Sequence, residues 1–188
     1  MKAGSRKLKV KNRDKETIAE KARKIRLLIL DVDGVMTDGS IILDNEGNEF
    51  KRFHVRDGHG IKMIQKAGIT VIIITGRKSK VVDIRARELG IKEVHQKIFR
   101  KSDVFEKMLK KYSCEEENAA FMGDDIVDRE LLRRAGLTAT PADAEDEAKQ
   151  LADIITKRGG GRGAVREFID LILKSSGLWK KVSGESLA

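Results

Sequence analysis

Short apolar runs alternate with amphipathic segments along most of this chain. The apolar runs are rich in Ile, Leu and Val and are too short to be core helices, so they predict buried β-strands. We expect the main strands at residues 27–32, 69–74 and 119–122, and shorter ones at residues 94–95, 137–139 and 154–155.

Segments with helical periodicity separate these runs. The clearest is residues 102–112, where four apolar side chains fall on one face: Val104, Phe105, Met108 and Leu109. Further helices are expected at residues 60–67, 79–89, 126–135 and 162–174. Repeated alternation of strand and helix predicts an α/β fold with a Rossmann-like, doubly wound parallel sheet and helices on both of its faces.

A different pattern follows the first strand. Residues 40–43 and 49–55 resemble two short strands, and the segment between them, residues 44–48, is rich in Asn, Asp and Gly. This composition is typical of a tight turn, so we expect a β-hairpin inserted after the first strand.

The charge of the chain is unevenly distributed. The net charge is +9 over 188 residues, and residues 1–26 hold eleven Lys/Arg against three Asp/Glu, a net +8. We therefore predict a basic N-terminal extension at residues 1–25, one domain at residues 26–176 and a C-terminal tail at residues 177–188. The rest of the chain is nearly neutral, and aromatic residues are only 4% of the full chain, which argues against a nucleic-acid-binding protein.

Three features of the sequence bear on where in the cell the protein is expected. No apolar run is long enough to span a membrane, and the basic N-terminus lacks the apolar stretch of a signal peptide. Cys114 is the single cysteine, which excludes an internal disulfide and fits a reducing compartment. We expect a cytoplasmic protein that does not insert into membranes.

The candidate chemistry begins at the end of the first apolar run, in Asp31-Val-Asp-Gly-Val-Met-Thr-Asp-Gly39. Asp31 and Asp33 are expected where open α/β sheets carry their ligands, and Gly34 allows the chain to turn sharply. One carboxylate can attack while the other transfers a proton, and together they can bind a hard cation. The alternative is a strand end with solvated turn aspartates.

Two further candidate motifs follow this one along the chain. Thr75 and Gly76 come directly after an apolar strand and could bind phosphate through a hydroxyl and a backbone N–H, or Thr75 could simply cap the turn. Lys101 precedes a helix, where a cation opposes the helix dipole, so a role in neutralising phosphoryl oxygens is favoured over helix stability. Lys97 and Arg100 compete for this role.

The last candidate motif is a second acidic cluster, Gly123–Asp128, after the strand at residues 119–122. Asp124 would complete a cation site, and Asp125 or Asp128 would orient it from behind. Asp124 or Asp125 could also cap the following helix. Oxygen ligands without a His or Cys cluster predict Mg²⁺ as the cofactor.

These four motifs, in this order, resemble the signature of the haloacid dehalogenase superfamily of phosphatases. The chain leaves no room for the cap domain that most members carry. Residues 26–174 resemble one capless family, the 3-deoxy-D-manno-octulosonate 8-phosphate phosphatases. The stretches that carry this resemblance are Asp31–Gly39, Val55–Gly60, Ile74–Lys78, Gly123–Asp125 and Gly160–Glu167.

The resemblance implies a role for each matching residue. Asp31 would be the nucleophile that forms an aspartyl-phosphate, and Asp33 would protonate the leaving sugar oxygen and then deprotonate water. Asp31, the backbone carbonyl of Asp33 and Asp124 would bind Mg²⁺, while Thr75 and Lys101 would hold the phosphoryl group.

The resemblance also implies a sugar-acid phosphate as the substrate and a homotetramer assembled through the hairpins. The residues expected to contact the substrate are His54, Val55, Arg56, Asp57, Gly58, Lys62, Gly76, Arg77, Arg85, Lys101 and Arg162. Arg56 and Arg85 could instead be solvated surface residues. Arg162 could close a neighbour's site, or its glycine-rich segment could be a plain turn.

Two features depart from the family pattern, namely the basic arm and the segment Lys97–Arg100, where smaller and more polar residues are expected. Several alternatives therefore stay open. The substrate could be a nine-carbon keto-sugar-acid phosphate of the sialic-acid type, the acceptor could be a sugar instead of water, or the chain could be a binding protein that uses its basic arm.

Overall fold

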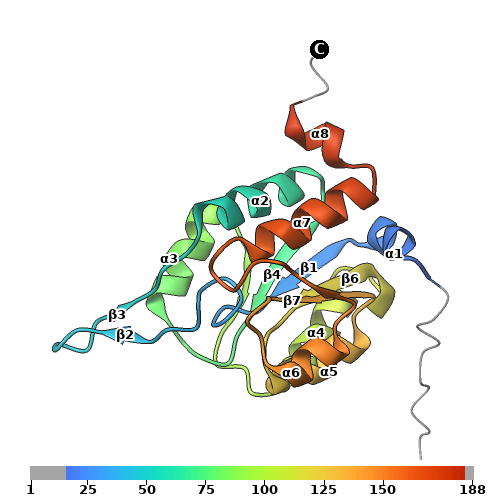
Figure 1. The fold of residues 1–188 in the computed structure, drawn as a ribbon. Helices are drawn as coiled ribbons and strands as arrows, with labels where there is room; N and C mark the ends of the chain where they lie inside the picture. Colours follow the sequence, from blue (N-terminus) through green and yellow to red (C-terminus); the bar gives the residue numbers. More distant parts are fainter. Residues whose placement is uncertain (1–15, 185–188) are drawn as a thin grey trace, which may run out of the picture.

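A parallel sheet of six strands forms the centre of the protein, in the order β5–β4–β1–β6–β7–β8 (Figure 1). This computed structural model describes residues 16–184. The strands are β1 (Leu27–Leu30), β4 (Thr70–Ile74), β5 (Glu93–His95), β6 (Ala119–Met122), β7 (Leu137–Thr140) and β8 (Ile154–Ile155). In the central pairs, Leu30 of β1 lies opposite Ile73 of β4 and Met122 of β6. The predicted doubly wound α/β fold is confirmed.

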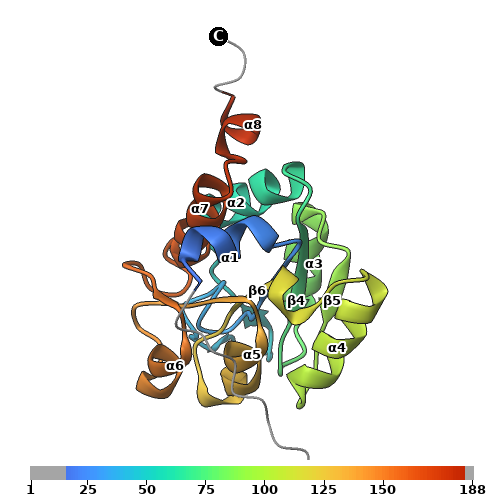
Figure 2. The ribbon, with the colours of Figure 1, turned by 90° about the vertical axis from the view of Figure 1, so that its right-hand side faces the viewer.

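Helices cover both faces of the sheet (Figures 1 and 2). One face carries α1 (Ile18–Lys24), α2 (Val55–Lys66), α3 (Lys80–Leu89), α7 (Ala164–Ser175) and α8 (Trp179–Ser183). The other carries α4 (Lys101–Lys111), α5 (Arg129–Arg134) and α6 (Asp146–Leu151). Leu28 and Leu30 of β1 enter the first core, while Leu27 and Ile29 enter the second, because side chains alternate along a strand. The uninterrupted apolar run of β1 is therefore buried on both sides.

The hairpin is shorter than predicted and projects from the domain (Figure 1). It consists of β2 (Ile42–Leu43) and β3 (Glu49–Phe50), with Ile42 paired to Phe50. At its turn the Asp44 carboxylate accepts hydrogen bonds from the backbone N–H groups of Glu46 and Asn48, at 2.9 and 2.7 Å. The predicted second strand, residues 49–55, ends at Phe50.

The prediction that helix α2 begins at residue 60 was wrong. It begins at Val55, so the expected loop at residues 54–58 is the helix N-terminus, where the His54 ring accepts a hydrogen bond from the Arg56 N–H at 3.3 Å. Gly58 and Gly60 disguise the helix in the sequence because glycine is a poor helix former. Both glycines lie against arginines: a Cβ on Gly58 would lie 2.3 Å from an Arg85 side-chain nitrogen.

Further differences between the predicted and observed helices are smaller. The predicted helix at residues 126–135 starts as a 3₁₀ turn, Ile126–Asp128, and continues as α5. Helices α6 and α8 were not predicted, and α8 lies within the predicted C-terminal tail. Helix α1 lies within the predicted basic extension, yet Ala22 is buried in the first core and Lys21 pairs with Asp153. The packed domain therefore starts before residue 26, and the remaining extension, residues 1–15, lies outside the described residues.

The sheet order fixes where a ligand can bind. The chain runs from β1 through β4 to the edge strand β5 and then returns to β6, on the opposite side of β1. The carboxyl ends of β1, β4 and β6 therefore meet at a topological switch point, where open α/β sheets bind their ligands. Within residues 16–184, no helix combines the length and apolar character needed to cross a bilayer.

Candidate active site

A cleft of about 370 Å³ opens at this switch point. It is lined by residues that follow β1, β4 and β6: Asp31, Asp33, Gly34, Gly39, Thr75, Gly76, Arg77, Ile98, Phe99, Lys101, Asp124, Asp125 and Val127. All four sequence motifs thus meet in one cleft, although its lining residues extend from Asp31 to Val127 along the chain.

Asp31 is the most confined carboxylate in the cleft. It follows β1 and is only 7% exposed. One of its oxygens accepts the Val32 N–H at 2.7 Å, and the other lies 2.8 Å from Nζ of Lys101. These two contacts fix the plane of the carboxylate, which is the preorganisation that a nucleophile requires.

Lys101 joins two carboxylates from opposite sides of the site. Its Nζ also lies 2.6 Å from Oδ1 of Asp128, whose side chain is fully buried. Burial alone would lower the pKa of Lys101, but Asp31 and Asp128 outweigh it and raise that pKa above its ordinary value. Lys101 is therefore a fixed cation. The competing Arg100 is exposed and lies 3.7 Å from Asp103, a salt-bridge distance.

Asp124 lies close to Asp31, and no Lys or Arg within residues 16–184 forms an ion pair with it. Oxygens of Asp31, Asp124 and Asp128 lie within 4.8 Å of one another. Burial, followed by the charges of Asp31 and Asp128, raises the pKa of Asp124 to about 8. Burial also raises the pKa of Asp31 to about 6, against the attraction of Lys101. One lysine does not neutralise three carboxylates, so the cluster favours a bound cation.

This cluster fits Mg²⁺. Its donors are carboxylate oxygens, which hard divalent cations prefer, and neighbouring backbone atoms orient them. Asp128 accepts the N–H groups of Asp124 and Asp125 at 3.0 and 3.4 Å, so it supports the Asp124 loop from behind. Asp125 caps the following 3₁₀ turn by accepting the Ile126 N–H at 2.6 Å.

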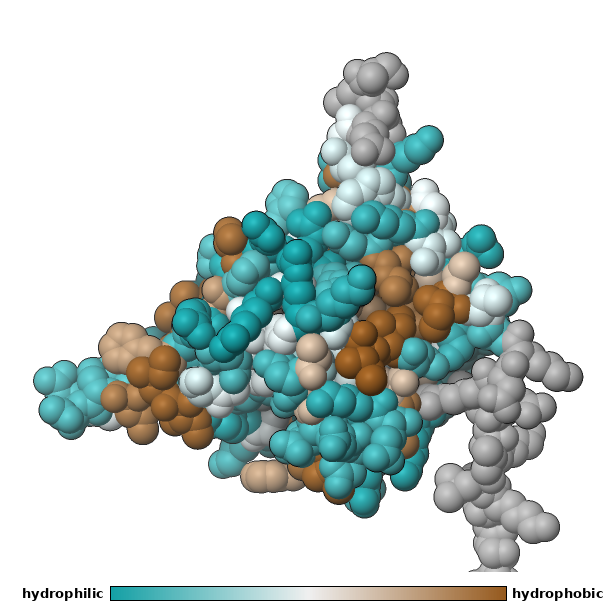
Figure 3. Space-filling model, in the orientation of Figure 1, coloured by the Kyte–Doolittle hydropathy of each residue, from teal (hydrophilic) through white to brown (hydrophobic). Residues whose placement is uncertain are grey.

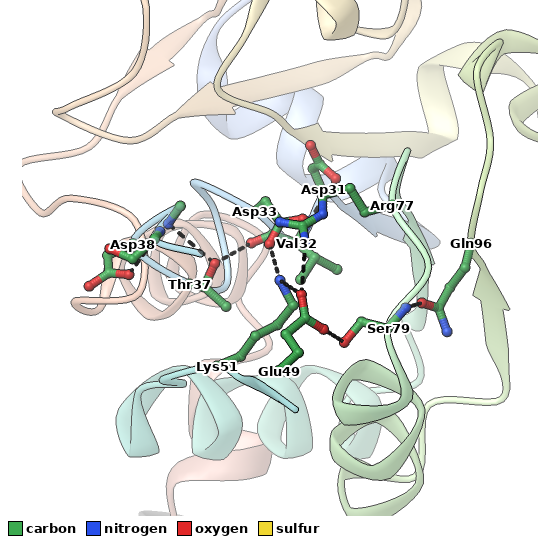
Figure 4. A network of polar contacts seen from close by, with 12 residues as sticks. Asp31, Val32, Asp33, Thr37, Asp38, Glu49, Lys51, Arg77, Ser79 and Gln96 are labelled. Atoms are coloured by element: carbon green, nitrogen blue, oxygen red, sulfur yellow. Dashed lines mark hydrogen bonds and ion pairs between the residues drawn. The ribbon is translucent and has the colours of Figure 1, made fainter. Parts of the chain in front are cut away.

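Asp33 has a partner that the sequence analysis missed. Lys51, one residue beyond β3, contacts the Asp33 carboxylate (Figure 4). The Lys51 side chain is only 1% exposed and also lies 3.5 Å from Glu49. Glu49 accepts hydrogen bonds from Arg77, at 2.9 Å, and from the Ser79 hydroxyl. Charged residues beside a hairpin turn look like solvated surface residues, so the local sequence carries no signal of this network.

The phosphate-binding candidates lie at the end of β4. Thr75 is 3% exposed and lines the cleft together with Gly76. Gly76 has open space around it, with the nearest atom 3.8 Å from an added Cβ. The space beside Gly76 is therefore open, and phosphate binding by Thr75 and Gly76 stays a prediction.

Several predicted substrate contacts do not line this cleft: His54, Val55, Arg56, Asp57, Gly58, Lys62, Arg85 and Arg162. Asp57 instead accepts the backbone N–H groups of Gly163 and Arg166, at 3.2 and 2.7 Å, and is 3% exposed. It joins α2 to α7. The guanidinium of Arg85 lies 5.7 Å from the Phe53 ring centroid and forms an ion pair with Glu88 at 2.8 Å.

The glycine-rich segment before α7 packs against the first motif. Gly161 donates to the carbonyl of Val35 at 3.0 Å, and a Cβ on Gly160 would lie 1.9 Å from the Gly34 carbonyl oxygen. Close backbone approach therefore requires glycine here. The neighbouring Arg162 is exposed and lies outside the cleft of its own chain.

The fold and this cleft are those of a haloacid dehalogenase-like hydrolase, and residues 80–169 match that family. The chain is 44% identical to the 3-deoxy-D-manno-octulosonate 8-phosphate phosphatase of Escherichia coli strain K12 over 170 residues, which are 90% of each chain. It is 41% identical to the Yersinia pestis enzyme of the same name, over 92% of each chain. The chain belongs to the 3-deoxy-D-manno-octulosonate 8-phosphate phosphatase family.

Solved structures agree with this assignment. The Yersinia pestis phosphatase superimposes with a TM-score of 0.85 at 42% identity, covering 87% of this chain and 88% of the other. The Moraxella catarrhalis phosphatase, solved in complex with magnesium ion, phosphate ion and a KDO molecule, gives a TM-score of 0.87 at 39% identity. It covers 89% of this chain and 97% of its own.

Proposed function

We propose that this protein is a Mg²⁺-dependent phosphatase that hydrolyses 3-deoxy-D-manno-octulosonate 8-phosphate to the free sugar acid and phosphate, a step in lipopolysaccharide sugar synthesis. The observation that carries the proposal is the cleft itself: Asp31, Asp33, Thr75, Lys101 and Asp124 converge there in a chain 44% identical to phosphatases of that name. The relative solved with magnesium, phosphate and KDO adds support.

The reaction proceeds in two displacements. An oxygen of Asp31 attacks phosphorus, the bond between phosphorus and the sugar oxygen breaks, and Asp33 gives its proton to that oxygen. Asp33 then takes a proton from water as the water oxygen attacks the aspartyl-phosphate and releases Asp31. Lys101 holds Asp31 in place and, with Thr75, stabilises the charge on the phosphoryl oxygens.

Asp31, the Asp33 carbonyl and Asp124 would hold the metal, with Asp125 and Asp128 orienting them. Bound Mg²⁺ would neutralise the phosphoryl group and the facing carboxylates. Phosphate release should therefore depend on Mg²⁺ and stop in excess chelator. Asp31→Asn should abolish it, whereas Asp146→Asn, at an exposed position on α6, should not.

The sugar acid would be bound by cations around the cleft. Arg77 lines the cleft and is 42% exposed. The other proposed contacts, among them Arg56, Arg85 and Arg162, lie outside this cleft. Of these, Arg162 with its glycine-rich segment would act on the site of a neighbouring subunit. Rates on eight-carbon and nine-carbon sugar-acid phosphates test the substrate. Equal rates on both, or faster release from the nine-carbon compound, would replace the present assignment.

A homotetramer assembled through the hairpins is part of this proposal. The hairpin exposes a continuous set of large apolar side chains, visible in Figure 3. These residues are Ile41 at 62%, Ile42 at 47%, Leu43 at 59% and Phe50 at 54% exposure. Apolar clusters of this kind mark protein interfaces. Ile42→Lys should lower the mass measured by light scattering, whereas Ile84→Lys, an exposed apolar position on α3, should not.

We also propose a reducing, cytoplasmic location, supported by the free and buried thiol of Cys114. A binding role for the basic arm, predicted at residues 1–25, is the second candidate function, and residues 1–15 are the part of it outside the described structure. Deletion of these residues separates the two: loss of a salt-sensitive nucleic-acid interaction with unchanged phosphate release would give the arm its own role.

A further inference from the structure

A chain of polar contacts joins the hairpin to the two motif loops at the cleft (Figure 4). Lys51 lies between Asp33 and Glu49. Glu49 is held by Arg77 and Ser79, and the Ser79 N–H donates to Gln96 at 2.7 Å. Lys51 therefore contacts two carboxylates. Asp33 belongs to the loop after β1, and Glu49 is bound to the loop after β4 through Arg77 and Ser79.

Burial defines what Lys51 can do. Its side chain is 1% exposed and is absent from the cleft lining, while Asp33, which it contacts, does line the cleft. A substrate in the cleft would thus meet the Asp33 carboxyl and not the ammonium behind it. Lys51 can therefore affect the reaction directly through Asp33 or, by way of Glu49, through Arg77, which lines the cleft.

The donor chemistry of lysine then determines how Asp33 is used. An ammonium has three donors and no acceptor, so the carboxyl oxygen that it contacts, Oδ1, has to act as an acceptor. A proton carried by Asp33 is directed to the other oxygen, Oδ2. No residue in the described part of the chain forms a hydrogen bond to Oδ2, so that oxygen remains available to exchange a proton.

We propose that Lys51, held in place by Glu49, is a positioning residue that fixes the Asp33 carboxyl so that Oδ2 transfers the proton in both displacements. This inference rests on the function proposed above. In the first displacement the O–H bond at Oδ2 breaks as the leaving sugar oxygen gains the proton. In the second, Oδ2 gains a proton from the attacking water. Lys51 keeps its own protons throughout.

The choice of leaving group provides a test. A sugar alkoxide needs a proton to leave, whereas p-nitrophenolate leaves without one, so only the first substrate needs Asp33 as an acid. Both substrates pass through the same aspartyl-phosphate, and its hydrolysis needs Asp33 as a base. The measurements are rapid-quench and stopped-flow kinetics with Mg²⁺ on 3-deoxy-D-manno-octulosonate 8-phosphate and on p-nitrophenyl phosphate.

For Lys51→Met we expect kcat on the sugar phosphate to fall about 10- to 100-fold, part of the 10²–10⁴-fold that general acid–base catalysis contributes, while KM changes by less than about 3-fold. The nitrophenol burst should keep its rate constant within about 3-fold, and the steady rate after it should fall with the sugar-phosphate rate. Asp33→Asn should give the same pattern with a larger loss.

Two further variants separate positioning from folding. Glu49→Gln loosens the hold on Lys51 without contacting Asp33, and it replaces Lys51→Met if that variant proves unstable. Its burst and steady rates should show the same pattern more weakly; its KM is not compared, because Glu49 also holds Arg77. Lys21→Met removes another buried lysine paired with a carboxylate, Asp153, and neither of these residues lines the cleft. It should lower the melting temperature and leave the kinetic pattern of the wild type unchanged.

The result that overturns the proposal is a Lys51→Met or Glu49→Gln protein in which burst and steady rate fall together, or in which neither falls while melting temperature drops. For Lys51→Met, a rise in KM alone would also overturn it, by placing Lys51 in substrate binding. Wild-type protein that hydrolyses p-nitrophenyl phosphate and alkyl phosphates but not the sugar phosphate would refute the proposed function only. The same comparison would then use the alkyl phosphate that the protein accepts. Wild-type protein without any activity would overturn both proposals.

Discussion

The carboxylate cluster in the cleft predicts that the metal-free protein becomes less stable as pH rises. Asp31, Asp124 and Asp128 have oxygens within 4.8 Å of one another, and the pKa of Asp124 is raised to about 8. At that separation two unit charges repel by about 3 kcal/mol with an effective dielectric constant of 20. Lys101 offsets part of this repulsion through Asp31 and Asp128.

Proton linkage gives the direction in which the free energy of unfolding changes with pH. In the unfolded chain Asp124 has its ordinary pKa of 3.8, so between that pH and about 8 the folded state holds a proton that the unfolded state has lost. The free energy of unfolding therefore falls with rising pH, by up to about 1.4 kcal/mol per pH unit from this one group. Above pH 6 Asp31 is largely ionised, because its pKa is about 6, so Asp124 dominates the slope there.

The perturbation is Asp124→Asn, which removes one charge and keeps the shape. The assay is urea unfolding in EDTA at several pH values from 6 to 8, with Asp146→Asn as an exposed control. We expect the variant to be more stable than the wild type by about 1–3 kcal/mol at pH 8, with a smaller difference at pH 6. Mg²⁺ should stabilise the wild type and have little effect on the variant.

A wild-type protein whose stability is flat or rises over this range, relative to Asp124→Asn, would refute the reasoning. It would mean that the three carboxylates do not repel one another in the folded protein. A variant that Mg²⁺ stabilises as strongly as it stabilises the wild type would remove Asp124 from the metal site.

Three further predictions follow from individual contacts. Asp31→Asn should lower kcat by on the order of 10³-fold or more, because an amide is a poor nucleophile; substantial turnover in single-turnover assays would remove Asp31 from that role. Gly160→Ala should destabilise the protein by about 3 kcal/mol in urea, because the new Cβ would lie 1.9 Å from the Gly34 carbonyl oxygen, and an unchanged midpoint would contradict this packing. Asp57→Ala should cost about 1–3 kcal/mol, since two N–H groups at the start of α7 lose their acceptor, and amide exchange at Gly163 should become faster.

The sequence by itself determined the sheet and the carboxylates that line the cleft. The run 27–30 is apolar at every position, because β1 is buried on both faces, and Asp31 follows it directly. The same logic places Thr75 after β4 and Asp124 after β6. Parallel strands bring their carboxyl ends to one edge, so local patterns were enough to predict that these side chains meet.

The tertiary structure alone decided the contacts that depend on close approach between distant segments. Gly58 and Gly60 hid the start of α2, since their packing against Arg85 and Arg166 leaves no periodic signal. Lys51 follows an exposed hairpin and looks like a surface lysine, but the fold buries it against Asp33, eighteen positions earlier in the chain. Periodicity reports which face of an element is buried, whereas such a pairing depends on how the elements are arranged in space.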